Sequence, residues 1–169
     1  MSPGSLLRAD LVALILFAVA AYFTRAGTTR TGAALAGGAA AAVYNVLADG
    51  AAARFAWWSY PTLGTWHAPA LAYVAVAFSY GGAIALIGWR LTRRFGWRGQ
   101  IGWIAVMSLL GFARDSFYAA RTGLLAFAPG IAPRLADLAG WILLYGVSHS
   151  VMRALAGPAD ADRLAHSRR

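Results

Sequence analysis

The chain contains no cysteine, and neither lysine nor glutamate occurs in its sequence. Without cysteine it can form no disulfide and carry no thiol nucleophile, iron–sulfur cluster or cysteine-ligated zinc. Its formal net charge of +9 therefore comes from arginine alone. These arginines lie between apolar runs and not along one polar face, so we expect no nucleic-acid partner.

Charged residues of both signs are scarce. They make up 12% of the 169 residues, whereas hydrophobic residues make up 60%. Soluble domains carry about a quarter charged residues, so this composition excludes an ordinary soluble domain. The expected solvent is a bilayer, and the expected location is the inner membrane of a bacterial cell.

Five apolar segments are long enough to cross a bilayer, which takes about 20 residues. They cover residues 8–24, 31–52, 68–89, 100–119 and 135–155 approximately, and 157–169 forms a polar tail. The connecting segments, including an expected loop over 90–99, are linkers and not domains. The sequence therefore predicts an all-α membrane protein, a single polytopic domain over residues 1–169 built as a bundle of five transmembrane helices.

Arginine distribution predicts the orientation of this bundle. One expected side carries Arg25, Arg30, Arg90, Arg93, Arg94, Arg98, Arg153, Arg163, Arg168 and Arg169, whereas the other carries Arg8, Arg54, Arg121 and Arg134. Basic residues in short loops remain cytoplasmic, so we expect the N-terminus outside and the tail in the cytoplasm. The first segment also has features of a secretory signal, but Asp10 and the arginines that follow it favour an uncleaved span.

Small residues make up most of the second span and occur at several positions in the third. The stretch from Thr31 to Tyr44 is almost wholly alanine and glycine, and Gly81, Gly82 and Gly88 lie in the third span. Small residues let helix backbones approach closely in membranes. We expect the second span at the centre of the bundle, and a packing role for these glycines.

An arginine and an aspartate, Arg114 and Asp115, interrupt the apolar run of the fourth span. Ionised groups in the hydrocarbon cost from about 3 to over 10 kcal/mol, and they usually face a bundle interior or mark a site. A helix rises about 1.5 Å per residue, which places both residues at the same outer depth as Asn45 and Asp49 of the second span. The sequence therefore predicts a polar layer near the outer interface.

Neighbouring residues on a helix point about 100° apart, so Arg114 and Asp115 are expected to be poor partners for each other. We expect Arg114 to pair with Asp49, which leaves Asp115 to Asn45, Arg54, His67 or water. Two interpretations stay open: an ion pair that holds two helices in register, or a functional cluster.

An aromatic loop is expected to close over this layer from outside. The candidate ligand-binding residues are Asn45, Asp49, Trp57, Trp58, Tyr60, His67, Arg114, Asp115 and Tyr118, with Asp49 and Asp115 as candidate catalytic acids. Anchoring at the headgroup level is the alternative role for the tryptophans. The segment 123–133 is expected in the outer interface or, alternatively, as a re-entrant lid.

No cofactor or metal is predicted. His149 lies alone on the fifth span, away from the polar layer, and His67 and His166 share no ligand spacing with it. Metal sites need several donors that converge at fixed distances. We expect His149 to be a hydrogen-bonded helix residue.

The chain's size, its expected spans and its seven tryptophans resemble the tryptophan-rich sensory or translocator-protein family, which binds porphyrins and sterol-like ligands. That family has paired prolines soon after a loop tryptophan, where this chain has Trp66-His-Ala-Pro69. The run Trp57-Trp-Ser-Tyr-Pro61 is similar to short stretches of polytopic carotenoid-modifying enzymes. Neither resemblance is sufficient to assign a family.

We expect a membrane protein that binds an amphipathic or isoprenoid-like small molecule in an outward-facing polar and aromatic pocket. Two alternatives stay open: an enzyme that transfers a proton from a carboxylic acid to a lipid or terpenoid, and a structural or assembly subunit of a membrane complex. The expected partners are membrane lipid, the lipid-like ligand, and a second copy of the chain or another membrane protein.

Overall fold

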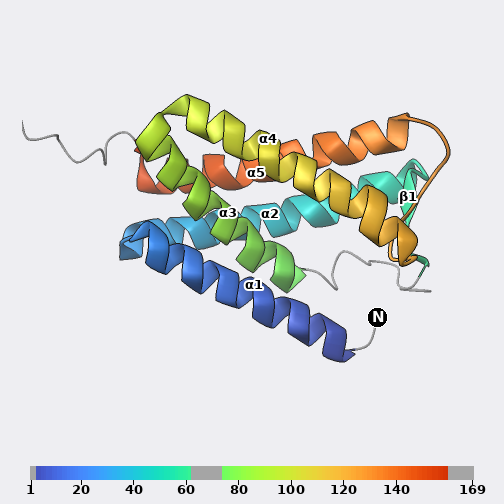
Figure 1. The fold of residues 1–169 in the computed structure, drawn as a ribbon, viewed down its shortest axis with the longest axis horizontal. Coiled ribbons are helices and arrows are strands. Elements are labelled where there is room, and N and C mark those ends of the chain that lie inside the picture. The colour runs from blue at the N-terminus through green and yellow to red at the C-terminus, as the bar shows by residue number, and fades with distance from the viewer. Residues whose placement is uncertain (1–2, 62–73, 160–169) are drawn as a thin grey trace, which may run out of the picture.

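The structure is a computed structural model that describes residues 3–61 and 74–159, with only the backbone of 3–6, 118 and 119. Its helices are α1 (Pro3–Thr24), α2 (Thr28–Arg54), α3 (Val74–Phe95), α4 (Trp97–Ala113) and α5 (Ala132–Ala156). A π-helical turn, η3 (Arg114–Ala119), extends α4, and two short strands, β1 (Trp58–Ser59) and β2 (Ala126–Phe127), pair antiparallel. The helices run roughly along the long axis, with β1 at one end of the bundle (Figure 1).

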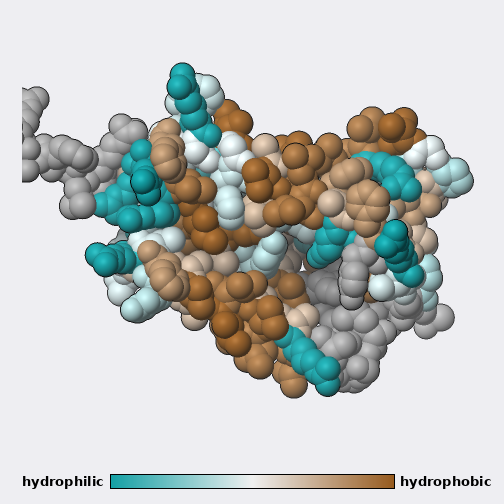
Figure 2. Space-filling view, in the orientation of Figure 1, coloured by the Kyte–Doolittle hydropathy of each residue, from teal (hydrophilic) through white to brown (hydrophobic). Residues whose placement is uncertain are grey.

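Four of the described helices are long and apolar enough to cross a membrane, namely α1, α2, α3 and α5. Large apolar side chains on their surfaces, such as Leu14 and Leu143, are more than half exposed. Figure 2 shows this apolar surface across the middle of the molecule, with hydrophilic residues gathered toward the two ends. The prediction of an all-α chain with several helices long and apolar enough to cross a membrane is confirmed. The number of five spans stays a prediction, because α4 has 17 residues before the π-helical turn.

Helix α2 packs between α3 and α5, as its small residues predict. A Cβ on Gly37 would meet the backbone oxygen of Ser148 in α5, and one on Gly38 would meet that of Phe78 in α3. The Ser148 hydroxyl also donates a hydrogen bond of 3.1 Å to the carbonyl oxygen of Gly81. The predicted packing role of the glycines is confirmed, since Gly81 lies against Ala41 of α2 and Gly82 lies between Phe17 of α1 and Ala34 of α2.

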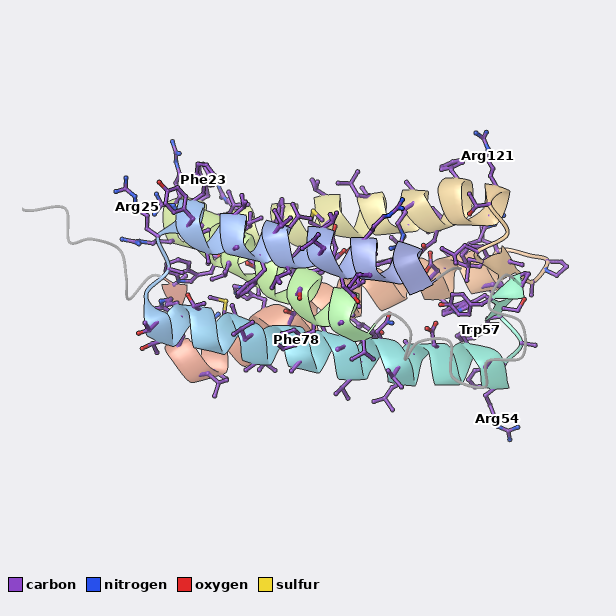
Figure 3. The ribbon with its side chains drawn as sticks, turned by 90° about the horizontal axis from the view of Figure 1, so that it is seen from below. Phe23, Arg25, Arg54, Trp57, Phe78 and Arg121 are labelled. Carbon is purple, nitrogen blue, oxygen red and sulfur yellow. The ribbon has the colours of Figure 1, made fainter. Side chains whose placement is uncertain are left out.

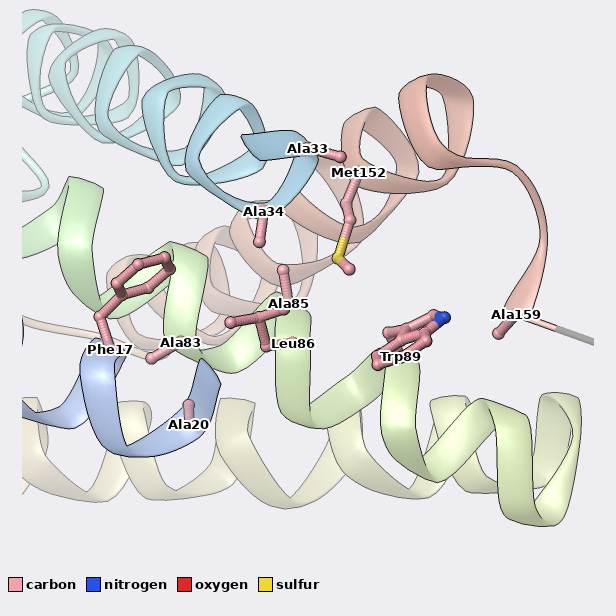
Figure 4. Close-up of a cluster of buried hydrophobic side chains, with 10 residues drawn as sticks. All are labelled: Phe17, Ala20, Ala33, Ala34, Ala83, Ala85, Leu86, Trp89, Met152 and Ala159. Carbon is pink, nitrogen blue, oxygen red and sulfur yellow. The ribbon is translucent and has the colours of Figure 1, made fainter. Parts of the chain in front are cut away.

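A cluster of buried apolar side chains joins four helices near the other end of the bundle (Figure 4). Phe17 comes from α1, Ala34 from α2, Leu86 from α3 and Met152 from α5. Leu86 and Ala34 are completely buried. Because this cluster contains no ionisable group, it acts as the apolar core that holds the helices together.

The expected loop over 90–99 is wrong, because α3 and α4 continue through it. Helix α3 ends at Phe95, six residues beyond the predicted end of the span, and α4 begins at Trp97. Gly96 alone separates the two helices, with φ 67° and ψ −155°, a conformation that is essentially restricted to glycine. Long arginine side chains can stay helical while their charged ends reach water. Arg93, for example, places its guanidinium 5.8 Å from the centre of the Trp89 ring.

The described members of the two predicted groups of arginines lie at opposite ends of the bundle. Figure 3 shows Phe23 and Arg25 at one end, and Arg54, Trp57 and Arg121 at the other. The second of these, which carries β1 and β2, is called the strand end below. Trp58 pairs with Phe127 and Ser59 with Ala126, so the loops that follow α2 and η3 are tied together there.

Candidate functional site

A cavity of about 140 Å³ lies at the strand end, between α2, α3, η3 and α5. Its lining is mainly polar and aromatic and comprises Tyr44, Asn45, Asp49, Trp58, Tyr60, Tyr80, Arg114, Asp115, Asp137 and Trp141. Apolar side chains complete the wall, among them Val76, Leu124, Leu125 and Leu144. The predicted polar residues of the second and fourth spans therefore meet around one hollow.

Asp49 is held by donors from the loop that follows its own helix. Its Oδ1 accepts hydrogen bonds from Trp58 Nε1 at 2.9 Å and from the Tyr60 hydroxyl at 2.8 Å. Burial, followed by the charge of Asp49, raises the pKa of Tyr60, so the phenol keeps its proton and remains a donor. The second oxygen of Asp49, Oδ2, is buried and accepts no hydrogen bond from the described residues.

Arg114 pairs with its neighbour Asp115, which contradicts the expected pairing with Asp49. Its Nε and Nη2 donate to Asp115 Oδ1 at 2.9 and 2.6 Å. The π-helical turn is the physical reason, because its hydrogen bonds span five residues and widen the turn. Ala120 N–H donates to the carbonyl oxygen of Asp115 in this turn. The long arginine side chain can then fold back on the next residue.

Trp141 of α5 fixes the other side of Asp115. Its Nε1 donates to Asp115 Oδ2 at 2.9 Å, and the Arg114 guanidinium lies 5.1 Å from the centre of its ring. Gly111 of α4 makes room for the indole, since a Cβ there would overlap it. The side chain of Asp115 is 7% exposed and that of Arg114 is 58% exposed, so the ion pair runs from the wall of the cavity to its open side.

Asp137 is the functional candidate that sequence reasoning missed. It lies four residues before Trp141 in α5, which places both side chains on the same face of the helix. Asp137 is 8% exposed, and its Oδ2 is buried with no hydrogen-bond partner among the described residues. The signal was present in the sequence, because Asp137 is a further aspartate within an apolar span and lies at the outer depth of the polar layer.

Tyrosines of α2 and α3 were also missed. Tyr44 and Tyr80 line the cavity, and Tyr80 is hydrogen-bonded to Tyr145, which is 2% exposed. The position of Tyr44 beside Asn45 carried a weak signal. The position of Tyr80 carried no signal, because an aromatic residue within an apolar span is as typical of helix packing as of a binding site.

The remaining predicted residues have different outcomes. Asn45 lines the cavity as predicted, whereas the Trp57 ring is not part of the lining and stacks on Phe55, with ring centres 4.9 Å apart. His67 lies outside the described residues, and only the backbone of Tyr118 is described. His149 Nδ1 is buried without a hydrogen-bond partner among the described residues, so the expected hydrogen bond of His149 is not made through this atom.

The segment after η3 forms part of the cavity wall, and its role as a re-entrant lid stays a prediction. Leu124 and Leu125 line the cavity, and Leu125 is 5% exposed. The backbone is held by the pairing of β2 with β1 and by Ala128 N–H, which donates to the carbonyl oxygen of Trp57 at 2.8 Å. This non-helical segment is packed against protein.

The site can hold a polar group by charge and hydrogen bonding and can exchange protons through its carboxyl groups. No group of three histidine or carboxylate side chains in the described part of the chain converges as metal ligands would. Comparisons with protein-family models, with curated proteins and with solved structures find no match to this chain. Functional inference therefore rests on the geometry of the cavity.

Proposed function

We propose that this chain is a multi-pass membrane protein that binds an amphipathic or isoprenoid-like small molecule with its polar head in the cavity. The observation that carries the proposal is the convergence of Asp49, Asp137 and the Arg114–Asp115 pair on one hollow. Ionisable groups within membrane-embedded helices are costly, and they generally mark a ligand or ion site.

The size of the cavity supports binding of a head group. Its volume of about 140 Å³ is similar to that of an engineered protein cavity, about 150 Å³, that holds benzene. A complete isoprenoid chain does not fit this volume. Val76, Leu124 and Leu144 instead offer apolar contact to the first part of a tail, and the rest would lie along the apolar helix surfaces.

The proposed orientation places this cavity on the outer side of the membrane. It includes five spans, an external N-terminus and a cytoplasmic tail in a bacterial inner membrane. The support is the unequal distribution of arginines between the two ends of the bundle, together with the rule that basic residues in short loops stay cytoplasmic. The strand end carries the smaller group.

Proton transfer to a bound lipid or terpenoid is the second candidate function, and Asp137 favours it. A buried carboxyl group with an unpaired oxygen can hold a proton and donate it as a general acid to a suitably placed substrate atom. In this case Asp137 joins Asp49 and Asp115 as a candidate acid.

The experiment is to purify the protein in native lipid discs and identify the small molecules that co-purify by mass spectrometry. We expect one amphipathic compound to be enriched with the wild-type protein and lost from the Asp49→Asn and Asp115→Asn variants. Asp10→Asn is the matched control, because Asp10 lies in α1 and is not part of the cavity lining.

Three outcomes separate the alternatives. Loss of the compound from the cavity variants, but not from the control, supports the binder. The enzyme is supported if the wild-type protein yields a chemically altered compound that is absent from correctly folded cavity variants. If the wild-type and variant proteins retain the same lipids, and only co-purification of another membrane protein changes, the binding proposal is wrong and the chain acts as an assembly subunit.

A further inference from the structure

The cavity lining contains more acidic side chains than basic ones. Three aspartates face one arginine, and Arg114 is already paired with Asp115. Asp49 receives its hydrogen bonds from the neutral donors Trp58 and Tyr60. Within the described residues, neither Asp49 nor Asp137 has a basic partner at ion-pair distance, so the lining contains more acidic groups than basic groups.

Asp137 is one of the acidic groups that face the cavity without a basic partner. The residue lines the cavity and is 8% exposed, yet its Oδ2 accepts no hydrogen bond from the described residues. Asp49 Oδ2 is in the same state. A buried carboxyl oxygen without a partner is unfavourable because it has lost its hydrogen bonds to water, and a positively charged group inside the cavity would remove this cost at both aspartates.

Aromatic rings provide the remaining surface of the cavity. Tyr44, Trp58, Tyr60 and Tyr80 line it together with Trp141. Ring faces attract ammonium groups within about 6 Å, and cages of aromatic residues bind methylated ammonium ligands. Because the Arg114 guanidinium already lies over the Trp141 ring, the rings of the other four residues are the candidates for contact with a ligand.

The donor arrangement distinguishes an organic cation from a metal ion. Metal ions need several oxygen ligands at short, fixed distances, and no such group of carboxylates converges in the part of the chain that the structure describes. An ammonium group, in contrast, needs only an acidic counter-group and ring faces. Additional negative charge would be disfavoured beside Asp49 and Asp137, which argues against a phosphate or carboxylate head group.

We infer that the cavity binds the ammonium group of an amphipathic amine, with Asp49 and Asp137 as counter-charges and the surrounding tyrosine and tryptophan rings as walls. This inference rests on the proposed function and names the chemical class of its ligand. The Arg114–Asp115 pair is a neutral part of the wall, and Trp141 holds it in place.

The test uses the full-length protein in lipid discs and octyltrimethylammonium as the probe. Octan-1-ol and octanoate have the same chain length with a neutral and an anionic head. Binding is measured by calorimetry and by the fluorescence change of the cavity tryptophans, and empty discs provide the correction for partition into lipid. We expect saturable binding of the ammonium probe at one site per chain, and no saturable binding of the other two.

Variants locate the binding at the cavity. Asp137→Asn and Asp49→Asn each remove one counter-charge while preserving shape, and we expect each to weaken the affinity for the ammonium probe at least tenfold. Asp10→Asn is expected to bind like wild type. Asp49→Asn retains acceptors for Trp58 and Tyr60, so it provides the test if Asp137→Asn does not fold.

The outcomes distinguish this inference from the proposed function. Saturable binding of octan-1-ol or octanoate with equal affinity, lost on cavity substitution, overturns the ammonium assignment and leaves the amphiphile-binding proposal in place. Ammonium binding that is unchanged in both aspartate variants also overturns the assignment. If none of the three probes saturates and no compound co-purifies with the wild-type protein, both proposals are wrong.

Discussion

At the scale of single residues, the indole of Trp141 connects three parts of the site. It donates a hydrogen bond to Asp115, carries the Arg114 guanidinium over its ring and packs against Gly111 of α4. Hydrogen bonds to ionised groups contribute about 1.5–3 kcal/mol. The side chain therefore orients the ion pair and also joins α5 to α4.

We predict that Trp141→Phe lowers the free energy of unfolding by about 2 kcal/mol, because it removes a donor to a buried carboxylate. The measurement is unfolding in mixed micelles as the fraction of sodium dodecyl sulfate rises, followed by tryptophan fluorescence. Trp97→Phe is the control, since Trp97 is 67% exposed and should change stability little. Equal losses in the two variants would show that the hydrogen bond to Asp115 contributes nothing.

Asp49 and Asp115 could be identified from the sequence because a carboxylate within an apolar span is rare and can be recognised without knowing its neighbours in space. The same rule applied to Asp137, which was missed because it lies in the second turn of its helix, close to the expected interface. Tyr80 and Trp141 could not be assigned. Their role depends on how α3 and α5 are rotated against α2, and packing between distant segments determines that rotation.

At the scale of elements, the close approach of α2 to its neighbours depends on particular glycines. A Cβ on Gly38 would overlap the backbone oxygen of Phe78, which cannot move without displacing α3. Gly32 lies on the same helix with nothing within 4 Å of the equivalent position. These two glycines provide a matched pair in which only one is needed for helix packing.

We predict that Gly38→Ala destabilises the protein by about 1–3 kcal/mol through overpacking. Gly32→Ala should be neutral or stabilising by up to about 1 kcal/mol, because alanine is the better helix former. Unfolding in mixed micelles measures both changes. A similar stability change in the two variants would mean that α2 and α3 separate at no cost, contrary to the packing described.

Approximate helix positions were predictable from the length of the apolar runs, but two local features were not. The π-helical turn at Arg114 changes which residues face each other, and α-helical spacing cannot reveal it. The continuation of α3 through Arg90, Arg93 and Arg94 was missed because charge was equated with a loop. Single residues such as Gly96 determine where a helix ends in this region.

At the scale of the whole molecule, orientation determines which compartment the cavity serves. The chain contains no cysteine, so a single introduced thiol reports one position without background. Ser59 in β1 and Thr28 at the start of α2 are both exposed and uncharged, and they lie at opposite ends of the bundle. Substitution of either residue leaves the arginine distribution unchanged.

We predict that Ser59→Cys reacts with a membrane-impermeant maleimide in right-side-out vesicles, whereas Thr28→Cys reacts only after the vesicles are opened. The physical basis is the retention of arginine-rich ends in the cytoplasm. The measurement is the mass shift of the labelled protein. The reverse labelling pattern would place the cavity on the cytoplasmic side and exclude an outward-facing site.

Gly96 is the single residue that joins α3 to α4, so its backbone conformation affects the angle between these two helices. The two helices meet at Gly96. Away from this junction, Tyr80 lies in the half of α3 that is farther from Gly96, and Arg114 directly follows α4. Arg114 lies roughly 27 Å along α4 from Gly96 at 1.5 Å per residue. A change of about 5° in the angle between the two helices would move the Arg114 end by roughly 2 Å, so the conformation of Gly96 contributes to the width of a cavity at the opposite end of the bundle.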